Sequence, residues 1–253
     1  MKNSVKAKLK KGEATFGSWM QLAHPAIAEI MVKAGCEWVA LDMEHSSITL
    51  SDAGVLLQVI EAHGAVPLVR LPENDPMLAK RLMDCGAYGI IVPMVNTKED
   101  AERAVAGVKY PPMGTRGVGL YRAQEFGSSF DAYFKTANKE SLVIVQIEHK
   151  DGVENIDEIV SVPGVDGVFI GPYDLSCSLG IPGEINHPLV EAARKKVVAA
   201  AKKAGVALGS HVVPLNPAEM KKRRKEGYTF LAYTTDAIAL NTVFREGFKK
   251  IQE

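Results

Sequence analysis

Short apolar runs alternate with longer amphipathic segments along most of the chain. Eight runs have the length of strands, and they cover residues 14–20, 36–43, 66–71, 89–95, 142–148, 167–171, 206–212 and 228–233. Segments with helical spacing follow them at residues 26–34, 50–62, 75–85, from 97 onward, 153–162, 188–204, 216–226 and 236–251. The predicted strands are nearly all apolar, which is typical of a parallel sheet covered by helices on both faces.

Eight strand–helix repeats predict an α/β fold of the (β/α)8 TIM-barrel class, with residues 1–253 as a single domain. A doubly wound open sheet is the alternative, but we find no glycine-rich dinucleotide fingerprint between a strand and a helix. Residues 109–134 and 176–187 interrupt the rhythm. Long connections of this kind on a compact barrel indicate a functional loop or a subunit contact.

Two carboxylates stand where predicted strands finish. Glu148 ends the fifth strand, and Asp174 follows the sixth. Because such strand ends gather at one face, two acids there would repel each other unless a cation lies between them. Oxygen ligands with room for water suit a hard divalent ion such as Mg²⁺ or Mn²⁺. The competing interpretation is that one acid caps the next helix while the other is solvated.

Other polar side chains are predicted at the same face. His45 follows the second strand, and Arg70 ends the third. Gln146 lies two residues before Glu148 and therefore on the same side of its strand. A guanidinium at the end of an apolar strand favours binding of a planar carboxylate over a surface salt bridge. For His211, at the end of the seventh strand, a pocket-lining place and a structural place both stay open.

The composition narrows the class of protein. Apolar residues make up 47% of the 253 residues, and 30 basic residues balance 30 acidic ones. A net charge of zero argues against nucleic acid or an acidic membrane as a partner. Three widely spaced cysteines predict reduced thiols. We find neither a signal peptide nor a transmembrane run, and we expect a soluble cytoplasmic protein.

Six segments between about residues 41 and 176 together carry a family resemblance: LDMEHSS, PLVRLPENDP, KRLMDCGAYGIIVPMV, YPPMGTRGVG, VQIEHKDGVENIDEI and VFIGPYDLS. In this order and spacing the chain resembles the metal-dependent 2-oxo-acid aldolases of the HpcH/HpaI type, named after 4-hydroxy-2-oxoheptane-1,7-dioate aldolase. These enzymes belong to the superfamily of phosphoenolpyruvate- and pyruvate-binding barrels. The resemblance therefore supports the barrel fold and implies a lyase.

The resemblance also implies roles for individual residues. Glu148 and Asp174 would bind the metal (Mg²⁺ or Mn²⁺, with Co²⁺ as a further candidate), and Arg70 would bind the carboxylate of the 2-oxo acid, supported by Gln146. His45, oriented by Asp84, would be the acid/base; the alternative for Asp84 is a solvated residue near its helix end. Tyr173 would contact substrate, and it departs from the family pattern, which usually has a small residue before the metal aspartate. Met43 departs too, where glycine is frequent, so the aldehyde partner is left open.

The implied reaction is that of a class II aldolase. A 4-hydroxy-2-oxo acid is cleaved reversibly to pyruvate and an aldehyde through a metal-bound pyruvate enolate. The resemblance further implies a homo-hexamer of paired trimers that exchange the last helix, residues 236–251. Two alternatives stay open: an oxaloacetate decarboxylase or related pyruvate-enolate lyase, and a non-catalytic barrel that binds small molecules.

Overall fold

The computed structural model describes residues 2–253. Eight parallel strands close into one barrel in sequence order, and β8 pairs with β1. The strands are β1 Thr15–Met20, β2 Trp38–Asp42, β3 Val66–Arg70, β4 Gly89–Val92, β5 Leu142–Ile147, β6 Gly167–Ile170, β7 Ala207–Val212 and β8 Phe230–Thr235. The predicted (β/α)8 TIM barrel is confirmed.

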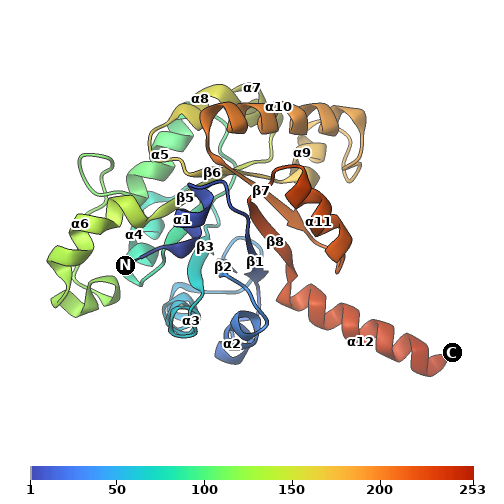
Figure 1. Ribbon diagram of the computed structural model, residues 1–253, viewed down its shortest axis with the longest axis horizontal. Coiled ribbons are helices and arrows are strands. Elements are labelled where there is room, and N and C mark those ends of the chain that lie inside the picture. Colours follow the sequence, from blue (N-terminus) through green and yellow to red (C-terminus); the bar gives the residue numbers. More distant parts are fainter. Residues whose placement is uncertain (1) are drawn as a thin grey trace.

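Helices form a layer around the barrel (Figure 1). They are α1 Ser4–Leu9, α2 Pro25–Lys33, α3 Leu50–Ala62, α4 Pro76–Asp84, α5 Lys98–Val108, the 3-10 helix η1 Arg122–Gly127, α6 Phe130–Glu140, α7 Lys150–Glu154, α8 Ile156–Ser161, α9 Pro172–Ser178, α10 Pro188–Ala204, α11 Pro217–Lys225 and α12 Asp236–Gln252. In contrast to the others, α12 projects away from the barrel (Figure 1). No helix within residues 2–253 is long and apolar enough to cross a membrane.

Several helices differ from the sequence prediction, including the 3-10 helix η1 within the stretch 109–134. The short α1 precedes the first strand, α6 fills the end of the stretch 109–134 and extends beyond it, and α9 begins the connection after β6. The apolar residues of α6 that become buried are few, Tyr133 and Ala137 among them, and this gives a weak periodic signal. The predicted helix 153–162 is divided into α7 and α8 at Asn155, whose backbone leaves the helical region.

Aromatic side chains fill the interior of the barrel. Trp38 stacks on Phe230 with ring centroids 4.2 Å apart, and Trp19 and Phe169 meet edge to face at 5.5 Å. Gly17 permits this packing, because a Cβ there would lie 2.1 Å from the Trp38 ring. The interior is therefore a packed core, and ligands can reach the barrel only at its ends.

The helix α1 closes the end where the strands begin. Its Val5 and Leu9 pack against the interior cluster. Lys6 Nζ lies 2.7 Å from Asp166 Oδ1, and Asp166 directly precedes β6. The opposite end, where the strands finish, is not covered in this way, and we call it the barrel mouth.

Candidate active site at the barrel mouth

Arg70, the last residue of β3, is fixed by three neighbours. Its Nε and Nη2 donate to Asp42 Oδ1 and Oδ2 at 2.9 and 2.7 Å, and its Nη1 lies 3.1 Å from Glu44 Oε2. The guanidinium also lies 4.6 Å from the Trp19 ring centroid. This pairing follows from the register, because Asp42 and Arg70 are partners on β2 and β3. A guanidinium has five N–H donors, so Arg70 retains free donors for another planar anion.

The two acids beside Arg70 have different protonation tendencies. Burial would raise the pKa of Asp42, but the hydrogen bond and charge of Arg70 lower it below its usual value. For Glu44, burial raises the pKa to about 7; the charge of Arg70 opposes this, and the carboxylates of Glu148, Asp42 and Asp174 add to it. One arginine therefore does not compensate the negative charge of the barrel mouth.

Glu148 follows β5 and is almost fully buried. Its Oε1 accepts a hydrogen bond from the Met94 N–H at 2.8 Å, and its Oε2 accepts one from Gln146 Nε2 at 2.7 Å. The predicted neighbourhood of Gln146 and Glu148 is thus observed. Burial raises the pKa of Glu148, and the charge of Asp174 raises it further. Asp174 itself is exposed in the first turn of α9.

The donor set at these two acids fits a hard divalent cation. Within residues 2–253 no three His, Cys, Asp or Glu side chains form a metal-ligand cluster, so the chain would supply the two carboxylates of Glu148 and Asp174. Water and substrate can complete such a site, since Mg²⁺ usually keeps several waters. Gln146 Oε1 is buried and has no partner within the described residues. A cation with its water would relieve the repulsion and could satisfy this oxygen.

His45 and Asp84 are not brought together within one chain. The His45 side chain is 60% exposed at the barrel mouth, with Nε2 3.6 Å from Glu44 Oε2. Asp84 ends α4, which runs back toward the start of the next strand, and its Oδ1 accepts a hydrogen bond from Arg116 at 2.6 Å. The two residues therefore lie at opposite ends of the barrel.

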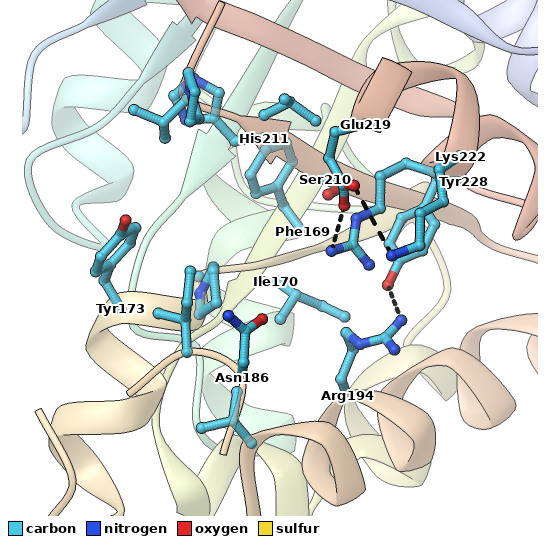
Figure 2. A pocket seen from close by; sticks show the side chains of 18 of the residues that line it. Phe169, Ile170, Tyr173, Asn186, Arg194, Ser210, His211, Glu219, Lys222 and Tyr228 are labelled. Atoms are coloured by element: carbon cyan, nitrogen blue, oxygen red, sulfur yellow. Dashed lines mark hydrogen bonds and ion pairs between the residues drawn. The ribbon is translucent and has the colours of Figure 1, made fainter. Parts of the chain in front are cut away.

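A cavity of about 450 Å³ opens beside the mouth, between the ends of β6 and β7 and the helices α10 and α11. Tyr173, Asp174 and His211 line it, and Figure 2 shows Tyr173 and His211 at the same side of the pocket. His211 thus takes the pocket-lining place. His149, by contrast, caps α7 through its Nδ1, which accepts from the Asp151 N–H.

Sequence reasoning missed the roles of Asp42, Glu44 and Trp19 around Arg70. A signal was present, since the second strand ends in acids and lies next to the strand that ends in Arg70. Only the register of β2 and β3 turns this signal into a bidentate pair. The contact of Trp19 leaves no trace in the sequence pattern, because Trp19 lies in an ordinary apolar run.

The profile of the family described as HpcH/HpaI aldolase/citrate lyase matches residues 15–241. The chain belongs to this family. The 5-keto-4-deoxy-D-glucarate aldolase of Escherichia coli strain E24377A is 39% identical to this chain over 254 residues, which cover 99% of this chain and 96% of the relative.

Two solved structures of HpcH/HpaI proteins have the same fold. One, from Burkholderia cenocepacia, superposes with a TM-score of 0.93 at 37% identity and covers 99% of this chain and 100% of its own. The other, from Desulfitobacterium hafniense, has a TM-score of 0.91 at 35% identity, covering 98% and 96%. The predicted activity, that of an aldolase and hence a carbon–carbon lyase, is confirmed by these findings. The non-catalytic alternative is thereby set aside.

Proposed function

We propose that this HpcH/HpaI aldolase cleaves a 4-hydroxy-2-oxo acid to pyruvate and an aldehyde at the barrel mouth. The observation that carries the proposal is the guanidinium of Arg70, which Asp42 holds in place near two carboxylates. The charges of Arg70 and Asp174 both act on Glu148. The E. coli relative is named for 5-keto-4-deoxy-D-glucarate. Counted from its other end, that compound is itself a 4-hydroxy-2-oxo acid, which supports this substrate class.

Glu148 and Asp174 would hold a divalent metal, with Mg²⁺, Mn²⁺ and Co²⁺ as the candidates. When bound, the metal acts as a Lewis acid toward the 2-oxo group and stabilises the negative charge that develops as the carbon–carbon bond breaks. Gln146 and the Met94 N–H orient Glu148 for this role through their hydrogen bonds. Their bonds fix the carboxylate before any ligand arrives, which lowers the reorganisation needed for catalysis.

Arg70 would bind the carboxylate of the 2-oxo acid. Asp42 occupies Nε and one Nη2 hydrogen, and Glu44 lies beside Nη1, so at least one hydrogen on each terminal nitrogen stays available. Because Asp42 and Trp19 hold the guanidinium in place, little side-chain entropy is lost when the substrate binds. Gln146 and Tyr173 would contact the remainder of the substrate.

His45 would take the proton of the 4-hydroxyl during cleavage and return it during synthesis. Its exposed position suits a group that exchanges protons with solvent. Since Asp84 lies at the other end of its own barrel, the predicted pair requires Asp84 from a neighbouring subunit. The Asp84 carboxylate lies against Gly119, and the stretch around that glycine exposes apolar side chains, as a subunit contact would require: Met113, Val118, Leu120, Tyr121 and Phe126.

A homo-hexamer of paired trimers with exchanged α12 helices is the assembly we propose. Figure 1 shows α12 extended away from its own barrel. Its apolar side chains are exposed: Leu240, Val243, Phe244, Phe248 and Ile251. An apolar groove of about 380 Å³ lies between α2 and the start of α12. A partner's helix in this groove would bury both surfaces, and a stable monomer in light scattering would contradict the assembly.

The intersubunit pair can be tested by mixing. His45→Ala and Asp84→Asn subunits should each be weak alone. After dissociation and reassembly together, some sites would combine an intact His45 with an intact Asp84, and activity should rise above that of either variant. No gain from mixed assemblies that form normally would remove Asp84 from the site.

The function is tested by metal-dependent pyruvate release from a panel of 4-hydroxy-2-oxo acids and from oxaloacetate. Higher kcat/KM for a hydroxy-oxo acid supports the aldolase proposal. Turnover of oxaloacetate alone would favour the decarboxylase alternative, and full activity after exhaustive chelation would exclude the metal.

We also propose that residues 1–253 act as one domain in the cytoplasm. The unpaired thiols of Cys36, Cys85 and Cys177 support this location.

A further inference from the structure

His211 stands at the barrel mouth, yet the roles proposed above leave it unused. The next residue, Val212, packs in the outer cluster under the helices, so His211 faces the barrel interior. Its ring meets Trp19 edge to face with centroids 5.9 Å apart. The charges of Arg70 and Asp42 both act on it. His211 therefore lies beside the place where the 2-oxo acid would bind.

The hydrogen bonds of His211 determine which ring nitrogen carries the hydrogen. The carbonyl oxygen of Thr234 lies 3.0 Å from Nε2, and since a carbonyl only accepts, Nε2 must be the donor. Thr234 has a φ of +48°, and its carbonyl also accepts from Ser18 Oγ at 3.1 Å. Burial lowers the pKa of His211 to about 4, so the ring is neutral near pH 7. Nδ1 then carries a lone pair and no hydrogen.

This lone pair has no hydrogen-bond partner among residues 2–253. His211 lines the cavity of about 450 Å³ together with Tyr173 and Asp174, and Figure 2 shows His211 and Tyr173. At the far end of that cavity the charged groups are already paired, as Arg194 is with Glu191. Near the mouth, an uncommitted neutral acceptor therefore shares the cavity lining with a proposed metal ligand, and it would be matched by a hydroxyl donor.

We propose that His211 determines specificity by accepting a hydrogen bond at Nδ1 from a hydroxyl on the aldehyde half of the substrate. The preferred partner would be a 2-hydroxyaldehyde, held between His211 and Tyr173. An alkanal of the same size would leave Nδ1 facing an apolar group without a partner, which costs transition-state binding. The inference rests on the proposed function, because it assigns the aldehyde of that same reaction.

The test compares two aldehydes of equal size, glycolaldehyde and propanal, in the addition of pyruvate by the intact metal-loaded enzyme. The measured quantity is the kcat/KM for glycolaldehyde divided by the kcat/KM for propanal. In His211→Phe, which keeps a ring against Trp19, and in His211→Leu, the ratio should fall by about threefold to tenfold relative to wild type, the range expected for one lost hydrogen bond. His211→Gln offers an acceptor again and should recover part of the ratio.

His63→Leu is the matched control, since His63 also contacts a main-chain carbonyl, that of Val59, but lies at the other end of the barrel. Comparing ratios between variants cancels the intrinsic reactivity of the two aldehydes. Either the Phe or the Leu variant suffices if the other does not fold, as judged by circular dichroism and melting.

An unchanged ratio in a folded His211→Phe or His211→Leu enzyme would overturn the proposal. An equal loss with both aldehydes, accompanied by an equal loss of oxaloacetate decarboxylation, would also overturn it by placing His211 in the pyruvate half of the site. Failure of the proposed function looks different, because wild type itself would then add pyruvate to neither aldehyde.

Discussion

The two ends of the barrel differ in whether their buried charged groups have partners within the protein. Where the strands begin, two buried lysines lie around the carbonyl of Ser141: Lys6 Nζ and Lys109 Nζ each donate to it at 2.6 Å. Lys109 also donates to Ser141 Oγ at 2.8 Å and to the Asn138 carbonyl at 3.0 Å, and Lys6 pairs with Asp166. Each lysine Nζ therefore has protein acceptors in place, although burial and the charge of Lys6 lower the pKa of Lys109 to about 7.

At the barrel mouth the chain does not satisfy its own charges. Besides burial, the charge of Asp174 raises the pKa of both Glu44 and Glu148, Glu148 also raises that of Glu44, and the charge of Arg70 opposes both shifts. The buried Gln146 Oε1 has no partner within residues 2–253. Uncompensated polar groups cost stability, so their persistence at one end indicates that a ligand completes them there. The end with the cations is therefore built for stability, and the end with the acids for binding.

The largest effect should follow from Glu148→Gln at the mouth. Aldol cleavage should fall to background, because the variant loses a carboxylate of the proposed metal site. Its free energy of unfolding without metal should stay unchanged or rise, since a buried charge among other acids is removed. Gln146 can rotate its amide and offer Oε1 to the new side chain. Steady-state kinetics, metal-binding calorimetry and chemical denaturation measure the three quantities.

Two results for Glu148→Gln would contradict the division between a stabilising end and a binding end. If Glu148→Gln destabilised the metal-free protein by several kcal/mol, its charge would be a structural element like those of the lysines. If it retained metal binding and activity, the metal would lie elsewhere. Asp174→Asn is the companion variant, and it should lose metal binding with even less effect on folding, because Asp174 is exposed.

The next largest effect concerns His45. His45→Ala should lower carbon–carbon cleavage of a hydroxy-oxo acid by roughly 10²–10⁴-fold, the range for a lost general base. Oxaloacetate decarboxylation removes no hydroxyl proton and should survive far better. Both rates are measured on the same metal-loaded preparation. Equal losses would make His45 a structural or metal-linked residue, and equal survival would assign the base to another group.

The reciprocal prediction applies to the opposite end. Lys109→Met should lower the free energy of unfolding by about 3 kcal/mol, because the buried Ser141 hydroxyl and the Asn138 carbonyl lose their donor, while the Ser141 carbonyl keeps Lys6. The kcat/KM of the folded fraction should stay close to that of wild type. Urea denaturation followed by fluorescence gives the stability. A stable but inactive variant would mean that the two ends are coupled, contrary to the division described above.

Much of this architecture could be predicted from the sequence, since parallel strands buried on both faces leave uninterrupted apolar runs. The same runs place Arg70, Glu148 and Asp174 at one end, because a strand's last residue is fixed by where its apolar run stops. Which residues pair across neighbouring strands was harder to predict from the sequence. The pairing of Arg70 with Asp42 depends on register, which a run of apolar residues does not encode.

Side-chain contacts between segments far apart in the sequence could not be predicted either. The Asp84 carboxylate belongs to the end of α4, and its bond to Arg116 depends on how the stretch 109–134 folds back. The conformation of this stretch is set by tertiary contacts and not by periodicity. A resemblance can suggest that Asp84 acts with His45, but only the course of α4 shows that one chain cannot form the pair.

A smaller effect is expected for Arg70→Lys. The ammonium keeps the charge but loses the planar fork, and it can no longer serve Asp42 and a substrate carboxylate together. The dissociation constant for pyruvate should rise roughly tenfold, which corresponds to about 1.4 kcal/mol. Calorimetric titration with pyruvate in the presence of metal measures it. An unchanged constant would place the substrate carboxylate elsewhere, and Arg70 would then be a structural partner of Asp42.

The smallest effect should be the pH dependence of wild-type stability at the mouth, because two groups oppose each other. Burial lowers the pKa of His211 from 6.5 to about 4, so the unfolded state binds more protons in this interval and stability rises with pH. Burial raises the pKa of Glu44 from 4.5 to about 7, so the folded state binds more protons there and stability falls with pH. Between pH 4.5 and 6.5 the two contributions have opposite signs.

Removing either group should therefore reveal the contribution of that group in metal-free protein. The Tm of His211→Phe, relative to wild type, should fall as pH rises from 4.5 to 6.5, because the variant lacks the stabilisation that His211 adds with rising pH. The Tm of Glu44→Gln, relative to wild type, should rise over the same interval, because the variant lacks the destabilisation that Glu44 adds with rising pH. Taking each variant against wild type at the same pH cancels the titration of all other groups. Differences that stay constant with pH in both variants would show that neither group titrates abnormally, and the acids at the mouth would then be better compensated than their surroundings indicate.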